Sequence, residues 1–309
     1  MRIPEHKKSA TIGSVTLSYV QYNPSDLQNL QNDARVDPHT QTLTEYPLVF
    51  LHGWPESSHS WKGVVNSLLG AGFSRTILCV DLKGLGHSSR SLDWKTYRKQ
   101  TMASEVMALL DQLEVQSYDL VGHDWGGVVA QELAIQWPEK VRKLVISNIS
   151  LITFLDGLRK GREAKQGIFD VDWYQSFQQT DLPATLVPGN EEAFLRYFLR
   201  SPDGVPSIPE ESIQESIDCY KIQGTPAAAS YWYRTLPYDT RRWLTLRKHR
   251  FEMPTLLIYG NKDPVINMNY VYGFEATFPK GSLVELEAGH FCHEERPEEF
   301  AASLSDFLP

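Results

Sequence analysis

The chain is poor in cysteine and has no excess of positive charge. Cys79, Cys219 and Cys292 are the three cysteines among 309 residues, and they lie far apart in the sequence. Three is an odd number, so we expect no disulfide framework, and a reducing compartment, most simply the cytoplasm, is favoured. The formal net charge of -8 argues against a nucleic-acid partner, because that binding depends on basic patches.

Long apolar runs, repeats and low-complexity tracts are also missing. No apolar run approaches the roughly 20 residues that a membrane helix needs, so we expect no membrane span. The basic segment 1–8 is not followed by an apolar stretch and therefore does not resemble a secretory signal. What is present, with 41% hydrophobic and 22% charged residues, is typical of a soluble globular protein with a sizeable core.

Short apolar runs alternate with helical patterns through the first half of the chain. An antiparallel strand pair is predicted within 9–22, and the polar segment 23–46 is expected to be a solvated loop. Four further strands, each followed by a helix or a loop, have the continuous apolar character of parallel strands covered on both faces. These four predicted strands are 47–52, 75–81, 118–121 and 141–147.

This alternation stops at about Leu151 and resumes at Pro254. Residues between these points have helical spacing and many aromatic side chains, and strands at 254–260 and 282–287 then precede a closing helix at 296–308. The pattern predicts an α/β fold with a mostly parallel central sheet, and a helical cap inserted after the sixth strand. The core is expected to comprise residues 1–150 and 251–309, with the cap at 151–250 over the strand ends where ligands bind.

The segment 122–127 predicts a sharp turn from a buried strand into a helix that begins near Trp125. Such a turn lifts its central side chain above the sheet and leaves backbone N–H groups beside it. Its central residue is Asp124, where chains with this pattern usually have serine. A carboxylate needs no base to deprotonate it and suits attack on a saturated carbon, which would produce an alkyl ester.

Hydrolysis of such an ester requires a base that activates water. His290 follows a late strand, and Asp263 follows another strand and can orient the histidine ring. Each residue alone has an ordinary explanation as a cap, turn or loop residue. All three lie after buried strands, in the order nucleophile, acid, histidine, and this favours a catalytic triad of Asp124, Asp263 and His290. The backbone N–H groups of Trp54 and Trp125 are the predicted oxyanion donors.

Metal binding is a weaker alternative. The segment His290–Glu294 contains two nearby histidines, but no third and fourth ligands follow at a recognised spacing. We therefore expect no metal and no cofactor.

Four motifs together resemble the epoxide hydrolase branch of the α/β-hydrolase fold, and the resemblance runs from about Ala10 to Pro309. It implies conversion of an epoxide and water to a vicinal diol through an ester on Asp124, and a cis bond between Trp54 and Pro55. The motifs are His52–Ser57 (HGWPES), Asp81–Ser88 (DLKGLGHS), Gly122–Gly127 (GHDWGG) and Gly289–His290.

The same resemblance implies that tyrosines of the cap protonate the opened epoxide. Tyr231–Arg234 resembles the second cap motif and assigns this role to Tyr233. The region of the first cap motif contains Trp173 and Tyr174 side by side, and both are predicted to bind substrate. The aromatic cap suggests a small apolar or aryl epoxide as the partner. Aromatic packing between cap and core is the ordinary alternative for any one of these side chains.

Two other functions stay open. Haloalkane dehalogenases also use an aspartate nucleophile, and Trp125 and Trp173 could hold a halide, although Trp54 stands where many of those enzymes have asparagine. A non-hydrolytic pathway enzyme or ligand receptor of the same fold is the third alternative, because fold does not fix function. An intact Asp124, Asp263 and His290 set argues against a pure receptor. A homodimer is the default expectation for the oligomeric state.

Overall fold

One eight-stranded sheet organises the described part of this computed structural model, which comprises residues 5–24, 43, 46–165, 172–200 and 208–308. The strand order is β1-β2-β4-β3-β5-β6-β7-β8. β1 pairs with β2, and β2 with β4, in antiparallel fashion, and all later pairs are parallel. The strands are β1 (His6–Ile12), β2 (Val15–Tyr22), β3 (Leu48–Leu51), β4 (Ile77–Val80), β5 (Tyr118–His123), β6 (Val141–Ser147), β7 (Thr255–Gly260) and β8 (Gly281–Leu286).

The sheet separates two apolar cores because successive side chains of a strand point to opposite faces. In β3, Leu48 and Phe50 join one core, and Val49 and Leu51 join the other. The first core is covered by α2 (Lys62–Gly70), α13 (Cys292–Glu295) and α14 (Pro297–Phe307), and the second by α3 (Lys99–Gln112) and α4 (Trp125–Gln136). The predicted parallel strands are confirmed, and β3, β4, β5 and β7 are buried along their whole length, whereas β8, at the edge of the sheet, is only partly buried.

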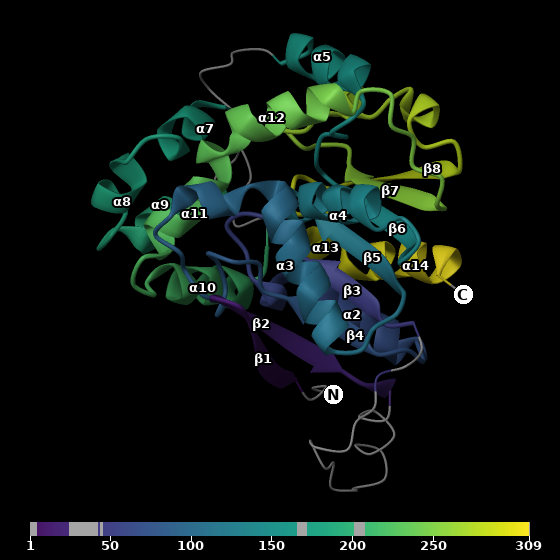
Figure 1. The fold of residues 1–309 in the computed structure, drawn as a ribbon, viewed down its shortest axis with the longest axis horizontal. Coiled ribbons are helices and arrows are strands. Elements are labelled where there is room, and N and C mark those ends of the chain that lie inside the picture. Colours follow the sequence, from purple (N-terminus) through teal and green to yellow (C-terminus); the bar gives the residue numbers. More distant parts are fainter. Residues whose placement is uncertain (1–4, 25–42, 44–45, 166–171, 201–207, 309) are drawn as a thin grey trace, which may run out of the picture.

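Seven described helices lie between β6 and β7, which confirms the predicted insertion after the sixth strand. Figure 1 shows them along one side of the molecule, with β1 and β8 at opposite ends of the sheet. We call this segment, residues 151–250, the helical insertion. Its helices are α5 (Leu155–Glu163), α7 (Trp173–Gln178), α8 (Leu182–Leu186), α9 (Glu191–Phe198), α10 (Glu210–Tyr220), α11 (Thr225–Arg234) and α12 (Leu236–Thr245).

Buried polar contacts fix the helical insertion to the core. The Trp232 indole donates to the Lys83 carbonyl oxygen at 3.0 Å. Lys99, on α3, donates to the Trp232 carbonyl oxygen at 2.5 Å and to Thr235 Oγ1 at 3.0 Å. The Lys99 ammonium also lies 4.3 Å from the centre of the Trp125 ring. Burial lowers the pKa of Lys99 to about 8. These contacts hold α11 above the start of α4.

Shorter elements complete the fold. Four 3₁₀ helices are described: η1 (Ser58–Trp61), η2 (Trp94–Tyr97), η3 (Met268–Tyr270) and η4 (Phe274–Ala276). The predicted N-terminal strand pair is confirmed, with Ala10 opposite Leu17. Most of the predicted loop 23–46 lies outside the described residues. In the ranges that the structure describes, no helix is both long and apolar enough to cross a bilayer.

Candidate active site

Asp124 lies at a strained turn between β5 and α4. Its backbone has φ 47° and ψ -126°, a conformation that residues with a side chain rarely adopt. The turn is stabilised by a hydrogen bond from the Asp124 N–H to the Ser147 carbonyl oxygen at 3.0 Å and by one from the Gly127 N–H to the Asp124 carbonyl oxygen at 2.8 Å. A Cβ atom on Gly126 would lie 2.3 Å from the Leu51 carbonyl oxygen, so only glycine fits there.

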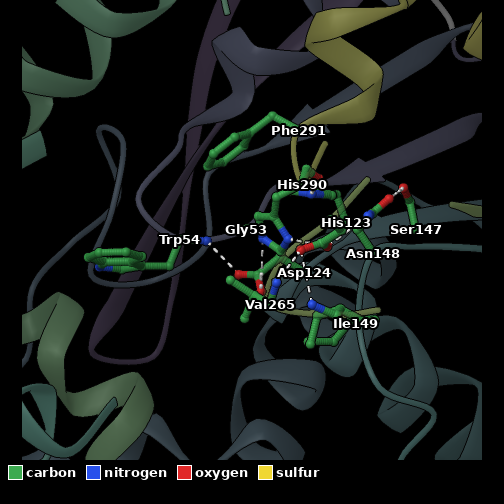
Figure 2. A network of polar contacts seen from close by, with 12 residues as sticks. Gly53, Trp54, His123, Asp124, Ser147, Asn148, Ile149, Val265, His290 and Phe291 are labelled. Carbon is green, nitrogen blue, oxygen red and sulfur yellow. Dashed lines mark hydrogen bonds and ion pairs between the residues drawn. The ribbon is translucent and has the colours of Figure 1, made fainter. Parts of the chain in front are cut away.

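The structure brings together the three residues of the predicted triad, of which Figure 2 labels Asp124 and His290. His290 Nε2 lies 3.6 Å from Asp124 Oδ2, and His290 Nδ1 lies 2.7 Å from Asp263 Oδ2. The Asp124 side chain is 11% exposed, and the Asp263 side chain is fully buried. The imidazole therefore lies between two carboxylates: that of Asp124, which lines a cavity, and that of Asp263, which is buried.

Three N–H groups donate hydrogen bonds to the Asp263 carboxylate. The backbone N–H groups of Val265 and Ile266 donate to Oδ1 at 2.7 and 2.9 Å, and the Asn148 side chain donates to Oδ2 at 2.8 Å. Burial alone raises the pKa of this carboxyl group. The charge of His290 and these hydrogen bonds outweigh burial, so the pKa of Asp263 lies below its ordinary value. Asp263 thus remains ionised and can fix the orientation of the His290 ring.

The two carboxylates favour the charged form of His290. Burial lowers its pKa, but the charge of Asp263, the hydrogen bond with Asp263 and the negative charge of Asp124 at 3.6 Å together raise it well above the ordinary value. Asp124 contributes part of this increase. If Asp124 lost its negative charge, the pKa of His290 would fall.

One of the two predicted oxyanion donors contacts the Asp124 carboxylate. The backbone N–H of Trp54 donates to Asp124 Oδ1 at 2.9 Å (Figure 2). Trp125 is the first residue of α4, and a backbone N–H at that position has no acceptor within its own helix. The peptide bond between Trp54 and Pro55 is cis, as the resemblance implied. A Cβ atom on Gly53 would lie 2.5 Å from Asp124 Cβ, so this close approach needs glycine.

Two tyrosines of the helical insertion face Asp124. Tyr174 on α7 and Tyr233 on α11 have ring centres 5.8 Å apart, and each ring centre lies 5.7 Å from that of Trp54. Burial, above all, raises the pKa of both phenols; for Tyr233 a hydrogen bond from the Trp125 side chain opposes this increase. Both phenols therefore stay protonated at neutral pH.

Trp173 lies elsewhere. Its side chain is 37% exposed and contacts the rings of Phe177, Tyr197 and Phe198. Neither of the two cavities that adjoin Asp124 includes it in its lining. Of the two adjacent residues predicted to bind substrate, the structure brings Tyr174 to the cavities and leaves Trp173 on the outer side of α7.

Two cavities meet at Asp124, and Tyr174 and Val265 also line both. The larger, of about 540 Å³, contains His290 and Tyr233 in its walls and is bordered by charged side chains. The smaller, of about 130 Å³, is mainly apolar and is lined by residues that include Ile149, Ile152, Leu155, Leu236 and Trp243. Asp124 is therefore accessible from two sides, under the helical insertion.

Residues 46–297 of the chain match the family model described as alpha/beta hydrolase fold. The chain belongs to the alpha/beta hydrolase family. It is 28% identical over 260 residues to the soluble epoxide hydrolase of Corynebacterium sp., covering 82% of this chain and 86% of that protein. It is 26% identical over 257 residues to the AB hydrolase superfamily protein YfhM of Bacillus subtilis, covering 81% and 85%.

Solved structures agree with this family assignment. Epoxide Hydrolase A from Mycobacterium thermoresistibile superposes with a TM-score of 0.79 at 22% identity, covering 99% of this alpha/beta hydrolase and 98% of that chain. At this identity the likeness supports the fold. The predicted α/β-hydrolase fold is confirmed.

A buried polar network lies behind the Asp124 turn of this alpha/beta hydrolase. Glu56 Oε2 accepts from the Gly53 N–H at 2.9 Å and pairs with His123 Nδ1 at 2.9 Å, and His123 Nε2 lies 2.9 Å from the His290 carbonyl oxygen. Glu56 Oε1 also pairs with His293 at 3.0 Å. The network joins the three loops that carry Trp54, Asp124 and His290.

Sequence reasoning missed parts of this site. Glu56 and His123 belong to motifs that were recognised, but nothing in their spacing indicates that they contact each other. Asn148 follows β6 and supports Asp263 through its amide. Tyr220 accepts a hydrogen bond from the Trp54 indole at 2.8 Å, and no local pattern singles it out. Only the folded chain brings these residues to the site.

Proposed function

We propose that this alpha/beta hydrolase is an epoxide hydrolase, which converts an apolar or aryl epoxide and water to a vicinal diol through a covalent ester on Asp124. The observation that carries the proposal is the pair of buried phenols, Tyr174 and Tyr233, facing an aspartate that is paired with a histidine. A carboxylate supplies the nucleophile, and two phenols supply hydrogen-bond donors for the epoxide oxygen.

In the first half-reaction, the epoxide oxygen accepts hydrogen bonds from Tyr174 and Tyr233. An Asp124 carboxylate oxygen attacks one ring carbon, the bond from that carbon to the epoxide oxygen breaks, and a tyrosine proton transfers to the departing oxygen. The product is a hydroxyalkyl ester of Asp124 and one phenolate. Because the ester is neutral, the pKa of His290 falls, and its proton restores the phenol.

In the second half-reaction, neutral His290 removes a proton from water, and the oxygen of that water attacks the ester carbonyl carbon of Asp124. The negative oxygen that develops is stabilised by the N–H groups of Trp54 and Trp125. The intermediate collapses, the diol oxygen leaves and takes a proton from His290, and the new Asp124 carboxyl group returns its proton to His290. Asp263 keeps the imidazole in the required orientation.

The cavities support a substrate with apolar substituents. The smaller cavity is lined mostly by aliphatic and aromatic side chains, and the larger provides room for a second substituent beside Tyr233. An epoxide bound at Asp124 could therefore extend one substituent into each cavity.

Dehalogenation is the less supported alternative. That chemistry would use indole N–H groups beside the nucleophile, and Trp125 and Trp173 were the candidates. Trp173 lies outside both cavity linings, and the Trp125 side chain donates to Tyr233. A paired assay separates the two functions: styrene-type epoxides should yield diol, and short haloalkanes should release no halide. Halide release without diol formation would overturn the proposal.

The pH dependence of the two half-reactions should differ. Ester formation does not require neutral His290, whereas ester hydrolysis does, and Asp263 still favours the charged imidazole after Asp124 is esterified. Lowering the pH from about 8 to about 6 should therefore slow hydrolysis by up to about 10-fold per pH unit, and ester-bearing enzyme should accumulate. Acid quench followed by intact-protein mass spectrometry measures this fraction. An equal ester fraction at both pH values would contradict the role of His290.

A further inference from the structure

A second group of chemically active side chains lies between the core and the helical insertion, away from Asp124. His87 belongs to the loop after β4, and Glu215 and Cys219 lie four residues apart on α10, on one helix face. One ligand atom from each lies within 4.8 Å of the other two. The His87 side chain is 49% exposed and Cys219 is buried, so the group opens to solvent on one side. We call these three residues the interface cluster.

Two of the three separations between ligand atoms of the interface cluster are close to those of a tetrahedral metal site. His87 Nε2 lies 3.5 Å from Glu215 Oε1, and Cys219 Sγ lies 3.8 Å from the same oxygen. In a tetrahedral zinc site with bonds of about 2.0–2.1 Å to nitrogen and oxygen and about 2.3 Å to sulfur, neighbouring ligand atoms are about 3.3–3.6 Å apart. These two separations need to change by only tenths of an ångström.

We propose that the interface cluster binds one Zn²⁺ ion and thereby links the core to the helical insertion. His87, Glu215 and Cys219 supply three ligands, and water or the nearby His59 on η1 supplies the fourth. A mixture of nitrogen, carboxylate oxygen and sulfur favours zinc over magnesium or calcium, which prefer oxygen ligands alone. As the zinc–sulfur bond forms, the thiol proton leaves to solvent.

The surrounding charges are compatible with a cation. The hydrogen bond with His87 lowers the pKa of Glu215 to about 2, so this carboxylate is charged at neutral pH. Burial raises the pKa of the Cys219 thiol to about 12, so the metal must displace its proton. Asp81 and Glu211 add negative charge nearby, and Lys7 and Arg90 oppose it.

Zinc in this position would stabilise the contact between the core and the helical insertion, and it would take no part in the reaction itself. The next residue of α10, Tyr220, holds the Trp54 indole, and the Trp54 N–H binds Asp124. A zinc ion bound by His87 of the core and by Glu215 and Cys219 of α10 would therefore fix α10 against the core, close to Trp54. Figure 1 shows α10 at the end of the helical insertion nearest β1 and β2.

The test uses Co²⁺ as a spectroscopic substitute for zinc in the full-length, chelator-treated protein. One equivalent of Co²⁺ should produce a saturable thiolate-to-cobalt charge-transfer band, and Zn²⁺ should abolish it by competition. Cys219→Ser should remove the band, and His87→Gln, at an exposed position, should weaken binding at least about 10-fold. His249→Gln is the matched control and should leave binding unchanged. Zinc at about 100 times its dissociation constant should raise Tm by about 5 °C.

Two results would overturn the zinc site. The first is a wild-type protein that shows no saturable thiolate band with Co²⁺. The second is a band that persists in Cys219→Ser, because Cys79 or Cys292 would then be its source. If Cys219→Ser fails to fold, His87→Gln decides the matter, since unchanged cobalt affinity in that variant contradicts the proposal. None of these readouts depends on epoxide turnover.

Discussion

Replacing His290 with glutamine is expected to reduce epoxide turnover at least about 10³-fold while the first half-reaction continues. Glutamine can accept or donate a hydrogen bond but cannot remove a proton from water, so the ester on Asp124 should form and persist. Intact-protein mass spectrometry should find the variant heavier by the mass of one substrate molecule, and peptide mapping should place that mass on Asp124.

Two matched variants sharpen this result. His290→Gln combined with Asp124→Asn should carry no adduct, because the nucleophile is lost. His249→Gln, on a histidine that lines neither cavity adjoining Asp124, should turn over like the wild type. A His290→Gln protein that retains wild-type turnover, or one that stalls with no adduct, would exclude His290 as the base of the second half-reaction.

Removing both cavity phenols should have a comparably large effect on the opposite half-reaction. Tyr174→Phe and Tyr233→Phe should each slow ester formation about 10- to 100-fold, and the double variant about 10³-fold, because a positioned acid contributes about 10²–10⁴-fold. The remaining phenol can still donate in each single variant. Single-turnover quench experiments measure ester formation directly, apart from its hydrolysis.

Tyr231→Phe is the control for these tyrosines. Tyr231 is also on α11, but its ring packs against Tyr97 with ring centres 5.5 Å apart, and it lines neither cavity that adjoins Asp124. Its loss should leave ester formation within about 2-fold of wild type. If a double Tyr174→Phe, Tyr233→Phe variant opened epoxides as fast as this control, neither phenol could be the proton donor.

The core of the fold and the position of the triad could be predicted from sequence because local patterns determine them. Continuous apolar runs identify strands covered on both faces, and Asp124 and Asp263 each follow such a strand. His290 follows β8, a partly buried strand at the edge of the sheet. Parallel strands end at the same edge of the sheet, so residues after them converge there. The glycines around Asp124 indicated the sharp turn for the same local reason.

The helical insertion was harder to predict at the level of single residues. Neighbouring helix positions differ by about 100° in direction, so the choice between Trp173 and Tyr174 depends on how α7 is rotated. That helix spans only Trp173–Gln178, too short for its apolar pattern to define a buried face. Contacts such as Asn148 with Asp263, or Trp54 with Tyr220, join residues far apart in sequence and leave no local pattern.

The covalent role of Asp124 is tested most directly by a single turnover of the wild-type enzyme in ¹⁸O-labelled water with enzyme in excess over epoxide. Water attacks the carbonyl carbon of the ester, so the label should enter the Asp124 carboxylate, and the first diol released should contain unlabelled oxygen from the enzyme. Digestion and mass spectrometry of the peptide that contains Asp124 locate the label. Label in the diol and none in Asp124 would mean that water attacks the epoxide directly, and would contradict the covalent mechanism.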